Sequence, residues 1–189
     1  MVELHTPRLI LRPLVPEDRP EFLRVHTLSW PTWSPWMPAL EPGQTFDDLF
    51  DQMLARIDRE LSAQTGLLLA AFLPDGPLIG FFTIFNIVRG VFHSASAGWR
   101  VSADQQRQGY ALESLTTLLT HAFSPDGLSL HRVQANIIPT NTASLSLARR
   151  VGFRQEGYAL RYLKIAGQWQ DHLMFAKLAD EHAAPSINR

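Results

Sequence analysis

The amino-acid sequence predicts an α/β (α+β) fold whose strands and helices follow the order β-α-α-β-β-β-α-β-α-β-β. Apolar residues alternate at period two in some segments and recur at helical spacing in others, and the two kinds of segment are interleaved. Clusters of glycine and proline separate the segments, and the chain has no internal repeat and no low-complexity linker. With 189 residues, of which 46% are hydrophobic, the chain is expected to form a single domain over residues 1–189.

The first third of the chain predicts one strand and then two helices. Residues 8–12 alternate between polar and apolar side chains and end at Pro13, as a strand does. A helix is expected to open at Pro16-Glu17-Asp18 and to run to about Leu28, and residues 29–43, rich in proline and tryptophan, are expected to form a loop. A second helix over about 46–61 is expected to bury one apolar stripe, made of Phe46, Leu49, Phe50, Met53, Leu54, Ile57 and Leu61.

Three strands in a meander are expected next. Residues 67–73 and 78–88 are apolar runs, and Pro74-Asp75-Gly76-Pro77 between them has the composition of a hairpin turn. A third strand is expected at 94–101.

The rest of the chain predicts helices and strands in alternation. The expected elements are a helix at 108–123 ended by Pro125-Asp126-Gly127, a strand at 131–137, a helix at 142–150 closed by Gly152, and strands at 153–160 and 169–178 around a turn at Gly167. The tail after Ala179, from about residue 180, is expected to be disordered.

Charge and composition exclude several classes of function. Basic and acidic residues number 17 and 18, so the formal net charge is −1, and no basic cluster predicts direct nucleic-acid binding. Cysteine is absent, which removes disulfides, thiolate nucleophiles and cysteine metal sites, and no motif predicts a metal centre. The sequence has no apolar run long enough to cross a membrane and no signal-peptide pattern. A cytoplasmic protein is expected, and nothing in the sequence predicts its oligomeric state.

A short turn between an expected strand and an expected helix indicates an acyl-CoA site. The turn reads Gln106-Arg107-Gln108-Gly109-Tyr110-Ala111, and Asn141-Thr142-Ala143-Ser144 follows about thirty residues later. A pyrophosphate needs several converging backbone N–H donors, which a turn that opens a helix supplies. Gly109 lets the backbone approach, because a Cβ would stand between the amides and the phosphate oxygens.

The order of elements, together with these two segments, resembles the GNAT superfamily of N-acetyltransferases. Between Thr6 and about Lys177 the chain is also similar to the Rim-type ribosomal-protein N-terminal acetyltransferases, and among these to the RimJ, alanine-directed type. Six segments carry this similarity: Thr6-Pro7-Arg8-Leu9, Asn86-Ile87-Val88-Arg89-Gly90-Val91-Phe92-His93, His131-Arg132-Val133-Gln134-Ala135-Asn136, Leu147-Ala148-Arg149-Arg150-Val151-Gly152-Phe153, Glu156-Gly157-Tyr158 and Gly167-Gln168-Trp169-Gln170-Asp171-His172.

This resemblance implies the GNAT fold, in which helices flank a central, mixed and mostly antiparallel seven-stranded sheet. It also implies transfer of acetyl from acetyl-CoA to the N-terminal α-amine of a protein, with a ribosomal protein as the implied acceptor.

The resemblance further assigns residues that bind the cofactor. The family's pyrophosphate cradle falls on the backbone of residues 106–111. In the family the pantetheine arm of CoA lies as a pseudo-strand beside the segment that is here Gly98-Trp99-Arg100-Val101. A backbone N–H of this segment would also stabilise the developing oxyanion. The family's asparagine, here Asn141, binds the CoA arm or orients the acceptor, although an asparagine before a helix is also a favoured N-cap.

Two departures from the family leave the catalytic residues open. Ala148 stands where many members carry a tyrosine that acts as general acid, and Ser144, one helical turn earlier, is the expected substitute. A hydroxyl hydrogen bond is sufficient for a thiolate, because the reference pKa of a thiol is about 8.5. Ser96 stands where related enzymes place a glutamate, so the general base is His93, Glu113 or a chain of waters. Ser144 also has a purely structural alternative, as a polar residue in the first turn of a helix.

Two further motifs have structural as well as functional interpretations. Asp171 and His172 look like a catalytic dyad, but adjacent residues on a strand point to opposite faces, so the pair is interpreted as structural. Trp30, Trp33 and Trp36 form either part of the core or a lid over the acceptor groove, and their irregular, proline-rich surroundings favour the lid.

Two other functions remain open at this level. One is an acetyltransferase for a small-molecule amine, such as a polyamine or an antibiotic; against it, the chain has no dense acidic segment to attract a multiply charged cation. The other is a non-catalytic domain that binds CoA or a peptide, which the loss of both the tyrosine and the glutamate keeps open.

Overall fold

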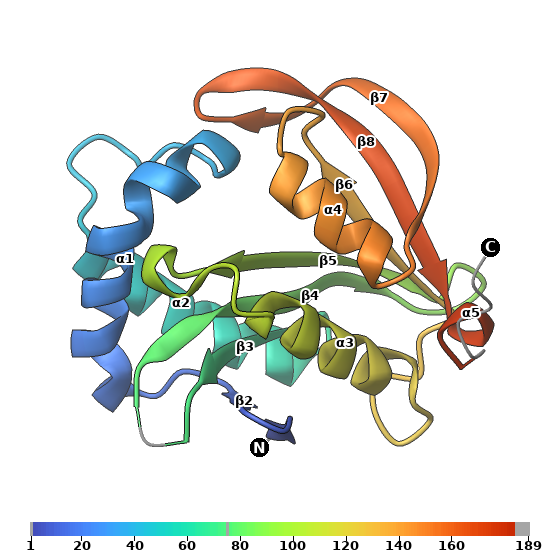
Figure 1. Cartoon of the computed structure of the whole chain (residues 1–189), viewed down its shortest axis with the longest axis horizontal. Coiled ribbons are helices and arrows are strands. Elements are labelled where there is room, and N and C mark those ends of the chain that lie inside the picture. The colour runs from blue at the N-terminus through green and yellow to red at the C-terminus, as the bar shows by residue number, and fades with distance from the viewer. Residues whose placement is uncertain (1, 75, 184–189) are drawn as a thin grey trace.

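A single eight-stranded sheet forms the centre of the computed structural model, which describes residues 2–74 and 76–183 (Figure 1). Its strands lie in the order β1-β2-β3-β4-β5-β6-β8-β7. They are β1 (Leu4–His5), β2 (Ile10–Arg12), β3 (Gly66–Phe72), β4 (Leu78–Val88), β5 (Ser94–Val101), β6 (Arg132–Ile137), β7 (Arg154–Ile165) and β8 (Gln168–Leu178). Neighbouring strands are antiparallel except for the parallel pair β5 and β6, which confirms the expected mixed, mostly antiparallel sheet.

The helices cover both faces of this sheet. They are α1 (Arg19–Trp33), α2 (Phe46–Ala63), α3 (Tyr110–Phe123), α4 (Thr142–Arg150) and α5 (Ala179–Ala183), with 3-10 turns η1 (Pro16–Asp18), η2 (Ser34–Trp36) and η3 (Ala103–Gln105). Buried hydrophobic residues of α1 and α2 belong to one cluster, and those of α3 and α4 belong to the other. None of the helices in the described ranges is both long and apolar enough to cross a membrane.

Strand β3 separates the two clusters. Leu67, Leu69 and Ala71 belong to the cluster with α3 and α4, whereas the alternate residues Leu68 and Ala70 belong to the cluster with α1 and α2. Successive side chains of a strand point to opposite faces, so the two clusters lie on opposite sides of the sheet. This explains why β3 is an unbroken apolar run that is buried along its whole length.

Strands β5 and β6 pair for only a short distance. The parallel register covers Ser94 with Arg132, Ala95 with Val133, and Ser96 with Gln134, whereas β5 continues to Val101 alongside β4. From Ala97 onward, the edge of β5 that faces β6 therefore has no strand partner. The sheet is split open at this point, close to the start of α4 (Figure 1).

Most expected elements are confirmed, and the differences at the N-terminal side have identifiable causes. The expected number of seven strands is wrong by one, because Leu4–His5 forms a two-residue edge strand paired with β2. The expected helix end at Leu28 is also wrong, because α1 continues through Pro31 to Trp33. Trp33 is 4% exposed and its Nε1 donates to the carbonyl oxygen of Val101 over 2.9 Å, so tertiary packing extends the helix.

Differences at the other boundaries follow from backbone geometry and end contacts. Helix α3 begins at Tyr110 rather than Gln108, because Gly109 precedes it with a φ of +86°. Strand β7 extends beyond residue 160 to Ile165, where Ala166 and Gly167 turn the chain with positive φ values. The tail is wrongly expected to be disordered from about residue 180, because α5 reaches Ala183; residues 184–189 lie outside the described ranges.

Candidate functional site

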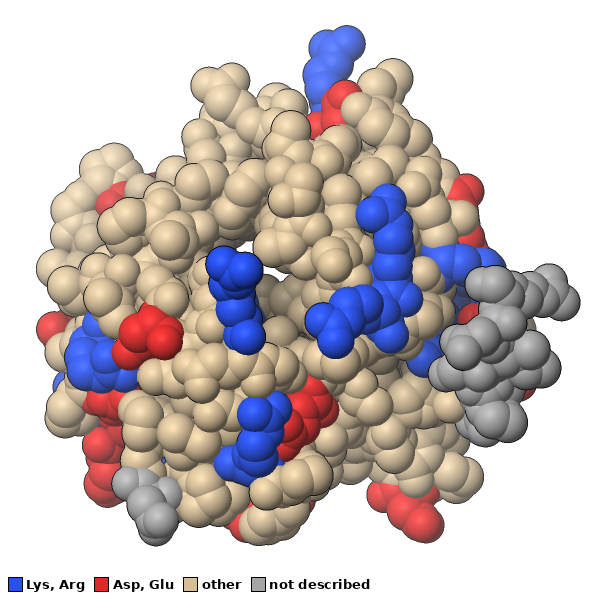
Figure 2. Space-filling model, in the orientation of Figure 1, with Lys and Arg blue, Asp and Glu red and all other residues tan. Residues whose placement is uncertain are grey.

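A cavity of about 620 Å³ lies where the sheet is split open. Residues of α1, η2, α2, β4, β5, α3 and α4 line it, together with the turn that precedes α3. The space-filling view shows a hollow in this face of the molecule, with Lys and Arg side chains around it (Figure 2). A second, smaller cavity of about 160 Å³ adjoins it and shares Trp36, Gly98, Trp99, Asn141 and Ser144 with it.

The turn before α3 forms one wall of the large cavity. Five of its six residues line the cavity: Gln106, Arg107, Gly109, Tyr110 and Ala111. The left-handed backbone of Gly109 directly precedes α3, so the first amides of the helix have no intrahelical acceptors and lie at the positive end of the helix dipole. This geometry suits an anion such as a pyrophosphate.

Gln108 takes a different position from its neighbours in the turn. It is absent from the lining of either cavity, and its carbonyl oxygen accepts a hydrogen bond from Nη1 of Arg8 over 3.0 Å. The guanidinium of Arg8 also stacks over the ring of Tyr110, with 4.6 Å from Cζ to the ring centroid, and pairs with Glu113. Gln108 therefore anchors the turn from outside the cavity.

The open edge of β5 forms a second wall. Gly98, Trp99, Arg100 and Val101 all line the large cavity. Because β6 has diverged here, the backbone of this segment is free on one side to pair with an extended ligand. The four residues assigned to the pantetheine arm are thus brought opposite the turn.

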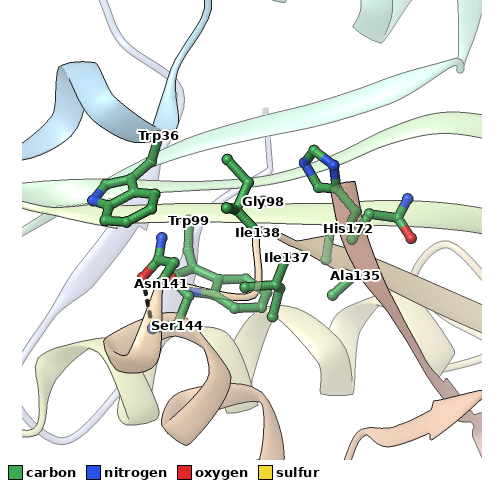
Figure 3. Close-up of a pocket in the computed structure, with 11 residues that line it drawn as sticks. Trp36, Gly98, Trp99, Ala135, Ile137, Ile138, Asn141, Ser144 and His172 are labelled. Atoms are coloured by element: carbon green, nitrogen blue, oxygen red, sulfur yellow. Dashed lines mark hydrogen bonds between the residues drawn. The ribbon is translucent and has the colours of Figure 1, made fainter. Parts of the chain in front are cut away.

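The start of α4 forms the third wall. Oδ1 of Asn141 accepts a hydrogen bond from the backbone N–H of Ser144 over 3.1 Å and so caps the helix (Figure 3). Asn141 and Ser144 both line the two cavities. Ala148 is fully buried in the core, and Ser144, one turn earlier on α4, lines both cavities, whereas Ser146 and Arg150 of the same helix line only the large one.

Neither side chain expected as a general base lies at the cavity. Nε2 of His93 lies 2.6 Å from the carbonyl oxygen of Ser129, and His93 is absent from the lining of both cavities. Glu113 accepts hydrogen bonds from Thr6 and Arg8. Burial raises the pKa of Glu113, but these hydrogen bonds outweigh it and bring the pKa below its usual value. The geometry therefore supports neither His93 nor Glu113 as the base.

His172 is the titratable side chain that sequence reasoning missed. It lines the small cavity together with Trp36, Asn141 and Ser144, and the close-up shows it on the opposite side of Gly98 from Trp36 (Figure 3). Its Nδ1 lies 3.0 Å from the carbonyl oxygen of Gln170, and burial lowers the pKa of His172. A neutral ring that donates through Nδ1 has a free lone pair on Nε2 and can accept a proton there.

Asp171 points elsewhere, as the alternation along the strand predicts. Its carboxylate accepts hydrogen bonds from the hydroxyl of Tyr158 over 2.8 Å and from the backbone N–H of Arg161 over 2.7 Å. The two residues therefore form no relay. The structural interpretation therefore fits Asp171. His172 lies on the opposite face of the strand, where it lines the small cavity.

The three tryptophans have separate roles. Trp33 belongs to the core, although one side of it reaches the large cavity, and Trp30 packs against Phe46 with 5.5 Å between ring centroids. Trp36, on η2, is 37% exposed and lines both cavities. Only Trp36 thus retains the position expected of a lid residue.

Positive charge predominates around the large cavity. Its lining residues include four arginines, Arg56, Arg100, Arg107 and Arg150, and no aspartate or glutamate from the described part of the chain. The same part of the chain contains no group of three or more His, Asp or Glu side chains that could hold a metal ion. The cavity is therefore suited to anionic ligands.

Comparisons with known proteins agree with this geometry. A family model described as an acetyltransferase (GNAT) domain matches residues 8–154. The [ribosomal protein uS5]-alanine N-acetyltransferase of Escherichia coli (strain K12) is 30% identical over 176 residues, which cover 93% of this chain and 90% of that protein.

Two solved structures share the whole architecture. Mycobacterium smegmatis RimJ in complex with CoA-disulfide superposes with a TM-score of 0.85 at 29% identity, covering 97% of this chain and 88% of that one. The ribosomal-protein-S5-alanine acetyltransferase from Vibrio fischeri superposes with a TM-score of 0.84 at 22% identity. The superposition covers 97% of this chain and 100% of that one, and shows that the two share a fold.

Proposed function

The chain belongs to the GNAT acetyltransferase family, with acetyl-CoA as acyl donor, and from this premise we propose that it acetylates the N-terminal α-amine of a protein. The relative from Escherichia coli is named as a [ribosomal protein uS5]-alanine N-acetyltransferase, and we propose that the acceptor here is the N-terminus of a ribosomal protein, presented in the cytoplasm. The observation that carries the proposal is that one cavity joins the turn before α3, the open edge of β5 and the start of α4.

The donor is proposed to lie along these three walls. The amides at the start of α3 bind the pyrophosphate, and the pantetheine arm pairs with the free edge of β5 at Gly98–Val101. Arg107 and Arg150, which line the same cavity, add positive charge for the phosphate groups. A backbone N–H of the β5 edge stabilises the oxyanion that develops on the thioester oxygen.

Transfer is proposed to be direct, because the chain has no cysteine to form an acyl-enzyme. The neutral amine attacks the thioester carbonyl, a C–N bond forms and the C–S bond breaks. Ser144 donates a hydrogen bond to the departing thiolate, and Nε2 of His172 accepts the proton that the new amide nitrogen loses. A base with a lowered pKa is sufficient, because the nitrogen becomes much more acidic once it has attacked the carbonyl.

Near neutral pH a larger fraction of an α-amine than of a lysine side chain is in the neutral form that can attack. Their reference pKa values of about 7.7 to 8.0 and about 10.4 differ by roughly 2.5 units, which is about 3.4 kcal/mol of deprotonation cost near neutral pH. The four arginines at the cavity also disfavour a polyamine, whose charges they would repel. Both arguments favour a protein N-terminus over the small-molecule alternative.

The proposal is tested with two peptides of one sequence that begins with alanine. One has a free N-terminus and blocked lysines, and the other has a blocked N-terminus and one free lysine. Release of CoA thiol should be at least tenfold faster with the first, and spermidine should be a poor acceptor. Equal rates for the two peptides would overturn the N-terminal assignment, and the absence of turnover with every amine would point to a non-catalytic CoA-binding domain.

A further inference from the structure

Arg100 carries a positive charge that no acidic group in the described ranges offsets. Its Nε and Nη2 atoms are buried and have no hydrogen-bond partner among the residues that the structure describes. Burial first, and then the nearby charge of Arg56, lower the pKa of Arg100 to about 9, so the side chain is still protonated at neutral pH. A buried charge without a partner is costly, and an anionic ligand would offset that cost.

The guanidinium of Arg100 is held in place by aromatic rings. Its Cζ lies 4.2 Å from the ring centroid of Phe81 and 5.3 Å from that of Trp33, and Trp33 is itself fixed by its hydrogen bond to Val101. Stacking uses the flat face of a guanidinium and fixes its orientation. Arg100 also lines the large cavity, so this oriented positive charge lies at the cavity wall.

The neighbouring charged and polar groups do not neutralise Arg100. Arg56, on α2, lines the same cavity and is already paired with Glu60, with 2.7 Å between Nε and Oε1. The buried His26 is neutral, because burial and the charge of Arg100 lower its pKa to about 3. Together Arg56, Glu60 and Arg100 have a net charge of +1, which leaves room for one negative charge from a ligand.

The position of Arg100 separates it from the proposed phosphate site. Phe81 and Trp33 belong to the hydrophobic cluster under α1 and α2, whereas the neighbouring Trp99 packs against the cluster under α3 and α4. Arg100 thus lies on the face of the sheet opposite the helix that the turn opens. It follows Gly98 by two residues on β5, a separation of roughly 7 Å along the strand.

We propose that Arg100, supported by Arg56, forms a carboxylate-binding subsite that recognises an acidic side chain near the N-terminus of the acceptor. The inference rests on the proposed function and specifies which acceptor N-termini the enzyme prefers. An extended peptide advances about 3.3 to 3.6 Å per residue, so an amine that reacts beside Gly98 places its second or third residue at Arg100. A dicarboxylic acyl group on the donor is the other source of the same chemistry.

The experiment compares peptides that differ in one charge. Acceptors that begin with alanine carry glutamate or glutamine at the second or third position, and kcat/KM is measured with acetyl-CoA at saturation. The wild-type enzyme should favour a glutamate peptide by about tenfold or more, the effect of one charge-assisted hydrogen bond. In Arg100→Gln this preference should disappear, so that the ratio of kcat/KM for the glutamate and glutamine peptides falls to about one.

The control is Arg19→Gln. Arg19 also stacks on a phenylalanine, with 4.6 Å to the ring of Phe50, but it is paired with Asp47 and Asp51 and does not line the cavity. This variant should retain the full preference for glutamate. Arg56→Gln provides a second probe should Arg100→Gln fail to fold, and it should weaken the preference several-fold.

The outcomes distinguish a carboxylate on the acceptor from one on the acyl donor, and failure of the subsite from failure of the proposed function. Equal wild-type rates for glutamate and glutamine peptides would overturn the subsite, as would a preference that survives Arg100→Gln. Faster transfer from succinyl-CoA than from acetyl-CoA, lost in Arg100→Gln, would assign the carboxylate to the donor and overturn the acceptor assignment. If no peptide is acetylated, glutamine peptides included, then the proposed function has failed rather than the subsite alone.

Discussion

Arg8 holds Gln108 from outside the cavity: Nη1 of its guanidinium lies 3.0 Å from the carbonyl oxygen of Gln108. The same side chain pairs with Glu113 on α3 and stacks over Tyr110. A residue at the start of the chain thus fixes a turn about a hundred positions later. The backbone amides that face the cavity are preorganised because the opposite side of the turn is tied down.

Replacing Arg8 with lysine should raise the KM for acetyl-CoA several-fold with little change in kcat. Lysine keeps the charge but loses the planar fork that reaches Gln108 and Glu113 together, which costs about 1 kcal/mol. Steady-state kinetics with varied acetyl-CoA measure this. Arg154→Lys is the control, because Arg154 is similarly exposed, at 44% against 46% of the side chain, and lies in ion pairs on β7. An equal rise in KM for both variants would contradict the bracing role.

Valine at Gly109 should abolish stabilisation by acetyl-CoA. In the wild-type protein a ligand at a hundredfold excess over its Kd adds about 2.7 kcal/mol, which thermal unfolding detects. Gly109 has a φ of +86°, and a Cβ there would lie 3.3 Å from Nη2 of Arg8. Gly90→Val is the matched control: Gly90 has a φ of +70° and open space around it, so its variant should lose stability by about 1 to 3 kcal/mol but keep the ligand shift. A normal shift in folded Gly109→Val would place the cofactor elsewhere.

Alanine at Ser144 should lower kcat more than it changes the KM for acetyl-CoA. A hydrogen bond that strengthens on the departing thiolate acts on the transition state, so its loss should cost about tenfold to a hundredfold in kcat. The measurement is a kcat and KM comparison with Ser146→Ala, because Ser146 is on the same helix and lines only the large cavity. Wild-type turnover in Ser144→Ala would leave Ser144 a structural residue of the first helical turn.

Glutamine at His172 should lower kcat by about a hundredfold, the lower range for loss of a general base. The neutral form of His172 is the active one, and burial lowers its pKa below 6.5. Below about pH 6.5 wild-type kcat should therefore fall more steeply, as the pH drops through the pKa of His172 in the folded protein, than deprotonation of the amine alone requires. This additional fall should vanish in His172→Gln and persist in His131→Gln, whose histidine is exposed at the start of β6. An unchanged pH profile in His172→Gln would rule His172 out as the base.

His26 should make the protein less stable in acid. Its pKa is about 3 in the folded state, because burial and Arg100 lower it, against a reference value of about 6.5 in the unfolded chain. Between these values only the unfolded state binds the proton, so His26 lowers the free energy of unfolding by about 1.4 kcal/mol for each pH unit below 6.5. Urea unfolding from pH 7.5 to 4.5 should show this slope. His26→Leu should flatten it and His5→Leu should not; an equal slope in all three proteins would exclude His26 as its origin.

Local signals predicted the elements around the cofactor well. Helix α4 has the expected bounds because both of its ends are coded locally, by the cap at Asn141 and by the left-handed Gly152. Strand β5 also has the expected bounds, and the turn at 106–111 opens a helix as its composition predicts. These features depend on neighbouring residues, so a single sequence is sufficient to find them.

Features that depend on distant partners were missed. Trp33 lies in a helix because it packs in the core and donates to Val101, a contact between residues 68 positions apart. Arg100 and His172 likewise line a cavity only because of the sheet face on which each lies. Which elements cover that face is determined in the folded chain. Periodicity shows that a strand exists but does not show what lies over each of its faces.

The divergence of β5 from β6 has a consequence for association with other chains. A strand edge with unpaired amides and carbonyls can pair with a strand of another chain, and proteins usually prevent this with charges, prolines or bulges. Here the unpaired edge lies at the bottom of a cavity, where a second β-strand with side chains on both sides would meet α4 and η2. A slender ligand with amide groups along its length can still enter. The walls that form the site therefore also enclose the stretch of β5 backbone that β6 leaves unpaired, so that an approaching strand edge would have to enter the cavity to reach it.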